Sequence, residues 1–444
     1  MLVENRVFRF EPARGERWLD SIARAFSAAL PEHTYPLRFS LVDVRDDEVV
    51  VEATLLRYEP GSAFESALSE IELLEPRRKT HQGSPFCAVQ VIPTGVGCEF
   101  GGFAGDACPV TNLLAATVDF LVTHPNAVNA SELNEMAGNV LYVEGKSLDD
   151  FLLGHLGLLP VAANRIGTFV DPTGIDYMDD VVNTLGAART AAGIDCPIYT
   201  VLEEELGVRI EWSPSGCAVG LVLRPEAIAG AVQTLLNEGV DAVGGVSVIH
   251  GVTTEMFERH QRGEIPNPSG GVEAIITHLV SKLFRVPTAH APLPYYQDVK
   301  PRTRENPRVA AELISTPHYF SVLKGLARAP RLQSLPSLAQ APDHVLTLNN
   351  VAAVVLPASC LGGVPALAAE LSSIPLIAVR ENDTVLNVSN EVMGMANVIE
   401  VDSYLEAAGV LTALRSGIAL ESLRRPIGEA REVGRRHAAV PSRV

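Results

Sequence analysis

Three stretches of this chain each read as an apolar strand, a helix and a second apolar strand. They span Val91–Ser131, Val219–Thr254 and Asn350–Asn387. Two strands joined through a helix lie parallel in one sheet, with a right-handed crossover. The sequence therefore predicts an α/β fold with a mostly parallel sheet that is built from several strand–helix–strand units.

The length of 444 residues predicts two or three domains. We expect a small α+β module at residues 1–80, an α/β core with a glycine-rich loop at residues 86–295, and a continuation of that core at residues 346–424. Residues 296–345 predict a Pro- and Arg-rich excursion, and residues 425–444 a tail. In the module we expect strands at Val7–Phe10, Leu37–Val44 and Val49–Leu56 and helices at Glu16–Leu30 and Phe64–Leu74. The segment Arg77–Pro85 is the expected linker after the module, and Arg308–Ile314 is the one helix expected in the excursion.

The net charge of −18 opposes binding to nucleic acid, which requires a basic surface. Pro, Gly or charged residues interrupt every long apolar run, and the N-terminus lacks a basic segment followed by an apolar one, so we expect neither a membrane span nor a secretion signal. The six cysteines have no framework spacing, which indicates free thiols. We therefore expect a cytoplasmic protein that binds a small molecule and neither nucleic acid nor membranes, with a homo-oligomer left open.

The first stretch contains a loop with several glycines ahead of a helix that is expected to begin near Pro109. Glycine lets a backbone approach a ligand closely, and a helix N-terminus attracts anions. Asp106 or Cys108 occupies the expected N-cap. The spacing matches neither a phosphate loop nor a dinucleotide fingerprint, so we predict no nucleotide cofactor. The expected ligand-contacting glycines are Gly97, Gly101, Gly102 and Gly105.

Polar side chains follow the next strand, where open α/β sheets place their ligands. They are His124, Asn126 and Asn129. Histidine exchanges protons near neutral pH, and asparagine amides orient polar groups. We predict that His124 is catalytic and that both asparagines bind substrate. Asn382, after the last strand of the third stretch, is a further predicted binding residue.

The stretch 269–284 predicts a helix whose opening residues Ser269, Gly270 and Gly271 form a second anion-binding end. Glu273 lies in its first turn and is a predicted catalytic group, although it also complements the helix dipole. His278 lies five residues further on, about 500° around a helix, so the two side chains are not expected to share a face. His290 follows the strand-like segment FRVP and is predicted to be catalytic.

Two cysteines allow a different mechanism. Cys108 near a helix N-terminus is expected to have a lowered thiol pKa, and Cys360 occupies a similar place in the third stretch. This pairing resembles that of two-base racemases of the aspartate/glutamate type. Four histidines are possible metal ligands: His124, His250, His278 and His290. Their spacing matches no metal-binding motif, so no metal site is predicted.

A set of motifs in fixed order resembles a known family. They include IPTGVG at residues 92–97, THPN at 123–126, LYVEG at 141–145, EAIITHLV at 273–280, TAHAP at 288–292, LPASCLGG at 356–363 and IAVREN at 377–382. Together they resemble the bacterial family DUF3326, well represented in cyanobacteria, over about residues 88–420. The resemblance implies the domain but no particular activity.

The sequence best predicts an enzyme that uses non-redox acid–base chemistry, of lyase, isomerase or hydrolase type, on a small polar, anionic metabolite. No redox-cofactor fingerprint is visible, and we predict no cofactor. The alternatives are a non-catalytic regulatory protein that binds a metabolite or nucleotide, a cysteine-based racemase-like enzyme, and an assembly factor.

Overall fold

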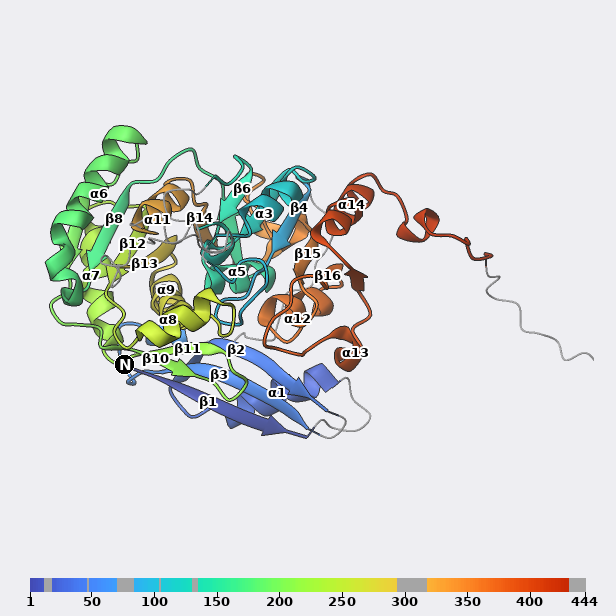
Figure 1. Ribbon diagram of the computed structural model, residues 1–444, viewed down its shortest axis with the longest axis horizontal. Helices are drawn as coiled ribbons and strands as arrows, with labels where there is room; N and C mark the ends of the chain where they lie inside the picture. Colours follow the sequence, from blue (N-terminus) through green and yellow to red (C-terminus); the bar gives the residue numbers. More distant parts are fainter. Residues whose placement is uncertain are drawn as a thin grey trace, which may run out of the picture.

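The computed structural model describes residues 1–11, 18–45, 48–69, 84–103, 105–129, 135–293 and 318–430. It contains two parallel sheets and an N-terminal antiparallel sheet, which confirms the predicted α/β class (Figure 1). The two parallel sheets lie on opposite sides of helices α5 and α9, and the N-terminal sheet packs below them in this view. Within the described ranges, no helix is both long and apolar enough to cross a membrane.

The N-terminal module is a three-stranded antiparallel sheet, in the order β1-β3-β2, covered by one helix. Phe26 of that helix packs edge-on against Phe39 at 4.7 Å, so an aromatic contact joins helix to sheet. Within the described part of the predicted second helix, residues Glu65–Leu68 are helical. Residues 70–74 and almost all of the linker expected at Arg77–Pro85 lie outside the described residues. The elements are β1 (Leu2–Phe10), α1 (Trp18–Ala29), β2 (Thr34–Val44), β3 (Val49–Arg57) and α2 (Glu65–Leu68).

The larger sheet has six parallel strands in the order β17-β16-β15-β4-β5-β6. The parallel pairing predicted for the first and third strand–helix–strand units is correct, because β4 pairs in parallel with β5 and β15 with β16. The first strand of the first unit lies at Cys87–Gln90, just before the predicted start at Val91. The strands and helices of this unit are β4 (Cys87–Gln90), α3 (Cys108–Ala115), β5 (Phe120–Thr123), α4 (Pro125–Val128), β6 (Val140–Tyr142), α5 (Gly145–Leu152), β15 (Val351–Pro357), α12 (Val364–Leu371), β16 (Leu376–Val379), α13 (Asn390–Met393), β17 (Val398–Val401) and α14 (Tyr404–Arg415).

The smaller sheet has four parallel strands in the order β13-β12-β8-β9. The second predicted unit is wrong. Its first strand, β11, pairs antiparallel with β10 in a separate two-stranded sheet, while its second strand, β12, pairs with β8 and β13. The elements are β8 (Ile166–Val170), α6 (Met178–Ala191), β9 (Ile198–Val201), β10 (Val208–Trp212), β11 (Ala218–Val222), α7 (Pro225–Asn237), β12 (Ala242–Ser247), α8 (Thr254–Gln261), α9 (Gly270–Phe284) and β13 (Thr288–Pro292).

The described part of the predicted excursion contains regular structure. Helix α11 (His318–Ala327) packs on β12 and β13, and β14 (Arg331–Ser334) pairs antiparallel with β7 (Leu156–Leu159). Neither α11 nor β14 was predicted in this part, and buried residues such as Tyr319 and Leu323 anchor α11. The helix expected at Arg308–Ile314 lies outside the described residues. In the predicted tail, residues 425–430 are exposed.

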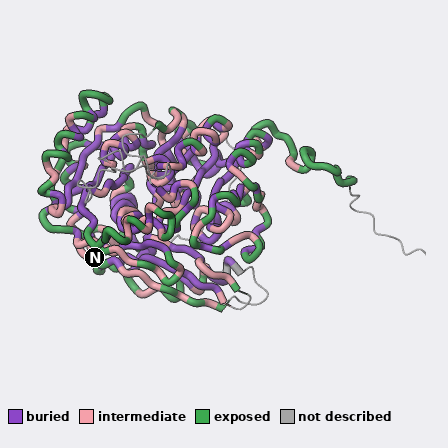
Figure 2. Tube along the Cα trace, viewed as in Figure 1, coloured by how far each residue is buried: buried purple, intermediate pink, exposed green. Residues whose placement is uncertain are grey.

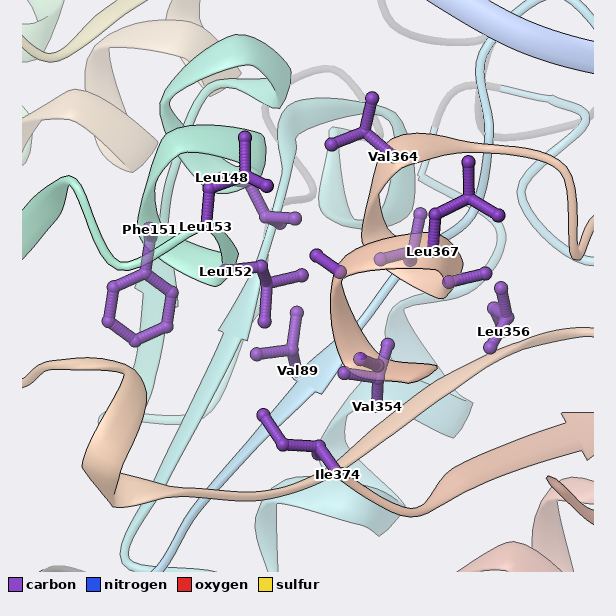
Figure 3. Close-up of a cluster of buried hydrophobic side chains, with 14 of the residues drawn as sticks. Val89, Leu148, Phe151, Leu152, Leu153, Val354, Leu356, Val364, Leu367 and Ile374 are labelled. Atoms are coloured by element: carbon purple, nitrogen blue, oxygen red, sulfur yellow. The ribbon is translucent and has the colours of Figure 1, made fainter. Parts of the chain in front are cut away.

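The hydrophobic core joins the N-terminal module to the larger sheet. One cluster contains Phe26 and Leu41 of the module together with Val89 of β4 and Val354 of β15. In Figure 3, side chains of α5 and α12 converge over β4 and β15. Figure 2 shows buried chain running through both parallel sheets and exposed chain at the outer helices. Because burial of apolar surface stabilises the fold, this shared core holds the module against the sheet.

Candidate functional site

A polar cavity of about 110 Å³ lies between the larger sheet and helix α9. It is smaller than the roughly 300–1,000 Å³ of sites for drug-sized ligands, so it suits a small molecule. It opens at the carboxyl ends of β4, β5 and β6, where a parallel sheet places its ligands. The lining residues are Thr94, His124, Pro125, Asn126, Asn129, Glu144, Gly145, Asn267, Gly270, Glu273, Ala274, Thr277, His278 and His290.

One side of the cavity is a stripe along α9. Gly270, Glu273, Ala274, Thr277 and His278 all line it, at the spacing of three and four residues that places side chains on one helix face. Glu273 and His278 were not expected to share a face squarely, and both nevertheless line the cavity. The two side chains lie at opposite edges of the stripe, and the cavity is wide enough to reach both.

Glu144 and His278 form a buried carboxylate–imidazole pair. Glu144 is the N-cap of α5, and its Oε2 accepts hydrogen bonds from the backbone N–H groups of Lys146 (2.9 Å) and Ser147 (3.1 Å). Its Oε1 accepts from Nδ1 of His278 and from Thr277 Oγ1 (3.3 Å). Burial by itself raises the pKa of Glu144, but His278 and the two backbone N–H groups outweigh burial and lower this pKa to about 2.

This pairing leaves one nitrogen of His278 available. An ionised carboxylate only accepts, so Nδ1 of His278 carries the proton that it shares with Glu144. The neutral ring is then unprotonated at Nε2, which has no hydrogen-bond partner among the described residues. The side chain keeps 15% of its surface exposed at the cavity. A histidine held in this way by a carboxylate is suited to accept a proton.

Glu273 and His290 form a second, looser pair. Oε2 of Glu273 lies 3.6 Å from Nδ1 of His290, and Nε2 of His290 lies 2.9 Å from Ser247 Oγ. Nδ1 of His290 is buried and has no hydrogen-bond partner in the described part of the chain. The segment FRVP is not a strand, because α9 ends at Phe284 and Arg285 caps it; His290 instead lies within β13. Glu273 is the more exposed member and therefore the one that can meet a ligand.

The predicted asparagines are held in place by the cavity wall. Asn126 Nδ2 donates to the carbonyl of Ile92 (3.1 Å), and Asn129 Oδ1 accepts from the Tyr142 hydroxyl (3.0 Å). The amide nitrogen of Asn129 has no partner among the described residues. It is therefore a free donor on a residue that lines the cavity.

Of the described residues of the glycine-rich loop, only Thr94 lines the cavity. Gly97, Gly101, Gly102, Gly105 and Asp106 all lie outside the lining. Gly101 has φ +84°, and a Cβ at Gly102 would overlap the carbonyl oxygen of Cys98, so both positions exclude larger residues for reasons of packing. Asp106 accepts from the Gly101 N–H at 2.5 Å and does not cap α3, whose N-cap is Ala107.

Three other predicted binding residues, Asn382, Gly271 and Ser269, lie outside the cavity lining. Oδ1 of Asn382 accepts a hydrogen bond from the backbone N–H of Phe100 (2.9 Å), and Nδ2 of Asn382 donates one to the carbonyl of Phe100 (3.2 Å). Gly271 packs against the backbone of Val219, where a Cβ would lie 2.5 Å from its Cα. Ser269 is the N-cap of α9 but makes no side-chain capping bond, and neither Ser269 nor Gly271 lines the cavity.

The predicted reactivity of the cysteines is wrong. All six cysteines are free and buried. Burial raises the pKa of the Cys108 thiol, and burial raises that of Cys360 to about 11, so both thiols stay protonated at neutral pH. Neither residue lines the cavity. This outcome removes the physical basis for a racemase-like pair.

Metal binding has no support in the described ranges, where no group of three or more His, Cys, Asp or Glu side chains is placed to hold an ion. His250 is exposed and lies outside the cavity lining.

Sequence reasoning missed Glu144, the most strongly connected acid of the cavity. The available signal was its position directly after the apolar run 140–143, which parallels the position of His124 after β5. Asn267 and Thr277 carried no comparable signal, because they follow no strand. His278 was not among the predicted catalytic residues.

Fold and cavity together define an α/β protein with a polar site at the carboxyl edge of a parallel sheet. The profile of a family described as "Protein of unknown function (DUF3326)" matches residues 87–424. This chain belongs to that family, which confirms the resemblance. It is also 33% identical, over 339 residues, to an uncharacterized lipoprotein from Synechococcus sp.; the match covers 76% of this chain and 92% of that protein. No solved structure matches the chain.

Proposed function

We propose that this protein is an enzyme that performs non-redox acid–base chemistry, of lyase, isomerase or hydrolase type, on a small polar molecule. The observation that carries the proposal is the Glu144–His278 pair, whose unpartnered Nε2 belongs to a cavity-lining ring. A carboxylate behind a histidine fixes its tautomer and stabilises the imidazolium that forms when the ring takes a proton. His278 is therefore the proposed base.

Glu273 is the proposed second proton-transfer group. It lines the same cavity from the first turn of α9, and its side chain is 22% exposed. Two proton-transfer groups around one substrate allow a proton to leave one atom and another to arrive elsewhere, which isomerases and lyases both require. His290 and Ser247 support Glu273 from behind.

The charged residues of the cavity lining indicate which net charge the substrate can have. Among the residues that the structure describes, the lining includes the carboxylates of Glu144 and Glu273 and no Lys or Arg. An anionic substrate would therefore meet little compensating charge, since the helix dipole at Gly270 is opposed by Glu273 in the same turn. We accordingly propose a small polar substrate without the net negative charge that the sequence suggested.

The test is incubation of the purified protein in D₂O with a panel of small polar metabolites. We expect at least one compound to be converted or to gain deuterium at carbon, as measured by mass spectrometry and NMR. His278→Asn should lose this activity, whereas His250→Asn, an exposed histidine outside the cavity, should keep it. A compound that stabilises the protein but is returned unchanged and unlabelled would contradict the proposal and favour a binding protein.

We also propose a cytoplasmic location, on the basis of the six free cysteines. The relative's printed name, a lipoprotein, suggests a membrane-associated alternative for this chain. Fractionation of cells that express the full chain distinguishes the two, because a lipoprotein remains with the membranes.

A further inference from the structure

His124 has a defined tautomer. It is the N-cap residue of α4, directly after β5, and its Nε2 accepts a hydrogen bond from the backbone N–H of Ile92 at 2.9 Å. A nitrogen that accepts this bond cannot carry a proton. In the neutral ring the proton therefore lies on Nδ1, which has no partner among the described residues.

His124 is also uncharged at neutral pH. Burial is the largest influence and lowers the pKa of His124 to about 4, with Glu144 acting in the opposite direction and His278 adding to the lowering. The expectation that His124 exchanges protons near pH 7 is therefore wrong. The ring is instead a neutral hydrogen-bond donor in the wall of the cavity that His278 also lines.

A neutral donor beside a base suits one kind of reaction. When a base removes a proton next to a carbonyl, negative charge develops on the carbonyl oxygen. A fixed N–H close to that oxygen stabilises the transition state more than the ground state. A neutral imidazole can serve as this donor when its surroundings prevent protonation.

From this arrangement we infer that His124 binds the carbonyl oxygen of the substrate through Nδ1–H, and that the substrate is a small, uncharged carbonyl compound with a hydrogen on the adjacent carbon. The inference deepens the proposed function and rests on it. His278 Nε2 takes the proton from that carbon, the C–H electron pair forms a C=C bond, and the π electrons of the C=O bond move to oxygen. Return of the proton to the opposite face of the same carbon, as the C=O bond re-forms, completes an isomerisation. In an elimination the C=O bond re-forms, the C=C electron pair moves to the bond with the next carbon, and a leaving group on that carbon departs with its bonding pair.

The tautomer can be measured without a substrate. Protein labelled with ¹⁵N-histidine is titrated by long-range ¹H–¹⁵N NMR, and the His124 signals are identified by their loss in His124→Gln. We expect a neutral ring with its proton on Nδ1 throughout the range from about pH 5.5 to 8, since His124 titrates near pH 4. A ring that is protonated at Nε2, or that becomes an imidazolium near pH 6.5, would overturn the inference.

The substrate class is tested with the D₂O panel, which includes uncharged carbonyl compounds, their alcohols and the matching carboxylates. We expect labelling next to a carbonyl in an uncharged compound. His124→Phe should reduce the rate by about 10²–10³-fold, the usual effect of losing one such donor. His124→Gln, whose amide can accept from Ile92 and donate to the substrate, should recover at least about tenfold of that loss.

The outcomes separate the inference from the proposed function. If only compounds without a carbonyl, or only the carboxylates, are processed and His278→Asn abolishes this, the acid–base function holds and the inference fails. If His124→Phe and His124→Gln lose equal activity, the donor role fails. If no compound is processed, the proposed function fails and the inference fails with it.

Discussion

The glycine-rich loop after β4 and the turn after β6 follow strands of the same sheet, yet only the turn supplies a charged group to the cavity. The loop contains five glycines and an aspartate and contributes Thr94. The turn contributes Glu144, which holds His278. The difference teaches that a dense glycine pattern reports close backbone packing as readily as ligand binding, whereas a single acid at the end of a strand holds a histidine that lines the cavity.

The largest expected effect comes from comparing a substitution of the histidine that Glu144 holds with a substitution in the glycine-rich loop. His278→Asn should reduce the activity found in the D₂O panel by about 10³-fold or more, equivalent to about 4 kcal/mol in the barrier, because the base is lost. Asp106→Asn, in the loop, should change the rate by less than about tenfold, because Asp106 lies outside the cavity lining and an amide oxygen can still accept from the Gly101 N–H. Initial rates of both purified variants give the answer, and an equal loss in both would break the comparison.

The second test concerns what the glycines do. Gly102→Ala should lower the free energy of unfolding by about 3 kcal/mol, because its Cβ would overlap the Cys98 carbonyl and the backbone must move. Gly138→Ala, where a Cβ meets no atom within 4 Å, is the matched control and should change stability by less than about 0.5 kcal/mol. Urea unfolding measures both. A Gly102→Ala protein that stays fully stable but loses activity would restore the loop as a binding element.

The third test concerns the acid of the turn. The pKa of Glu144 is lowered to about 2, so its ionised form stabilises the fold above its unfolded pKa of about 4.5, and this stabilisation is lost as the pH falls toward 2. Between pH 5 and 2 the wild type should lose about 2–3 kcal/mol that Glu144→Gln does not lose. Urea unfolding across that pH range measures the difference. Parallel curves for the two proteins would mean that the pair with His278 does not form.

The smallest expected effect is that of Cys108→Ala. The thiol is buried and protonated, so its loss should leave the rate within about twofold and stability within about 1 kcal/mol. Thiol-alkylation kinetics on the native protein provide a second measurement, since buried thiols react slowly. A loss of activity comparable to that of His278→Asn would return the cysteine mechanism to consideration.

Prediction of the fold succeeded where the signal was local. Periodicity and length located β2, β3, α7, α9 and α12, and strand–helix–strand order predicted parallel pairing in the larger sheet. It failed at β11, because antiparallel pairing with β10 depends on a partner that the local pattern does not specify. Prediction of the site located His124, Asn126, Asn129, Gly270, Glu273 and His290, all of which line the cavity.

The sequence by itself determined the α/β class, the family and the polar side chains that follow strand β5, because these depend on local periodicity and on motif order. Only the tertiary structure decided that Glu144 meets His278 across 134 positions and that His124 stays uncharged. The physical reason is that a hydrogen bond and a pKa depend on distance and burial in space. Both were set here when α9 packed between the two sheets.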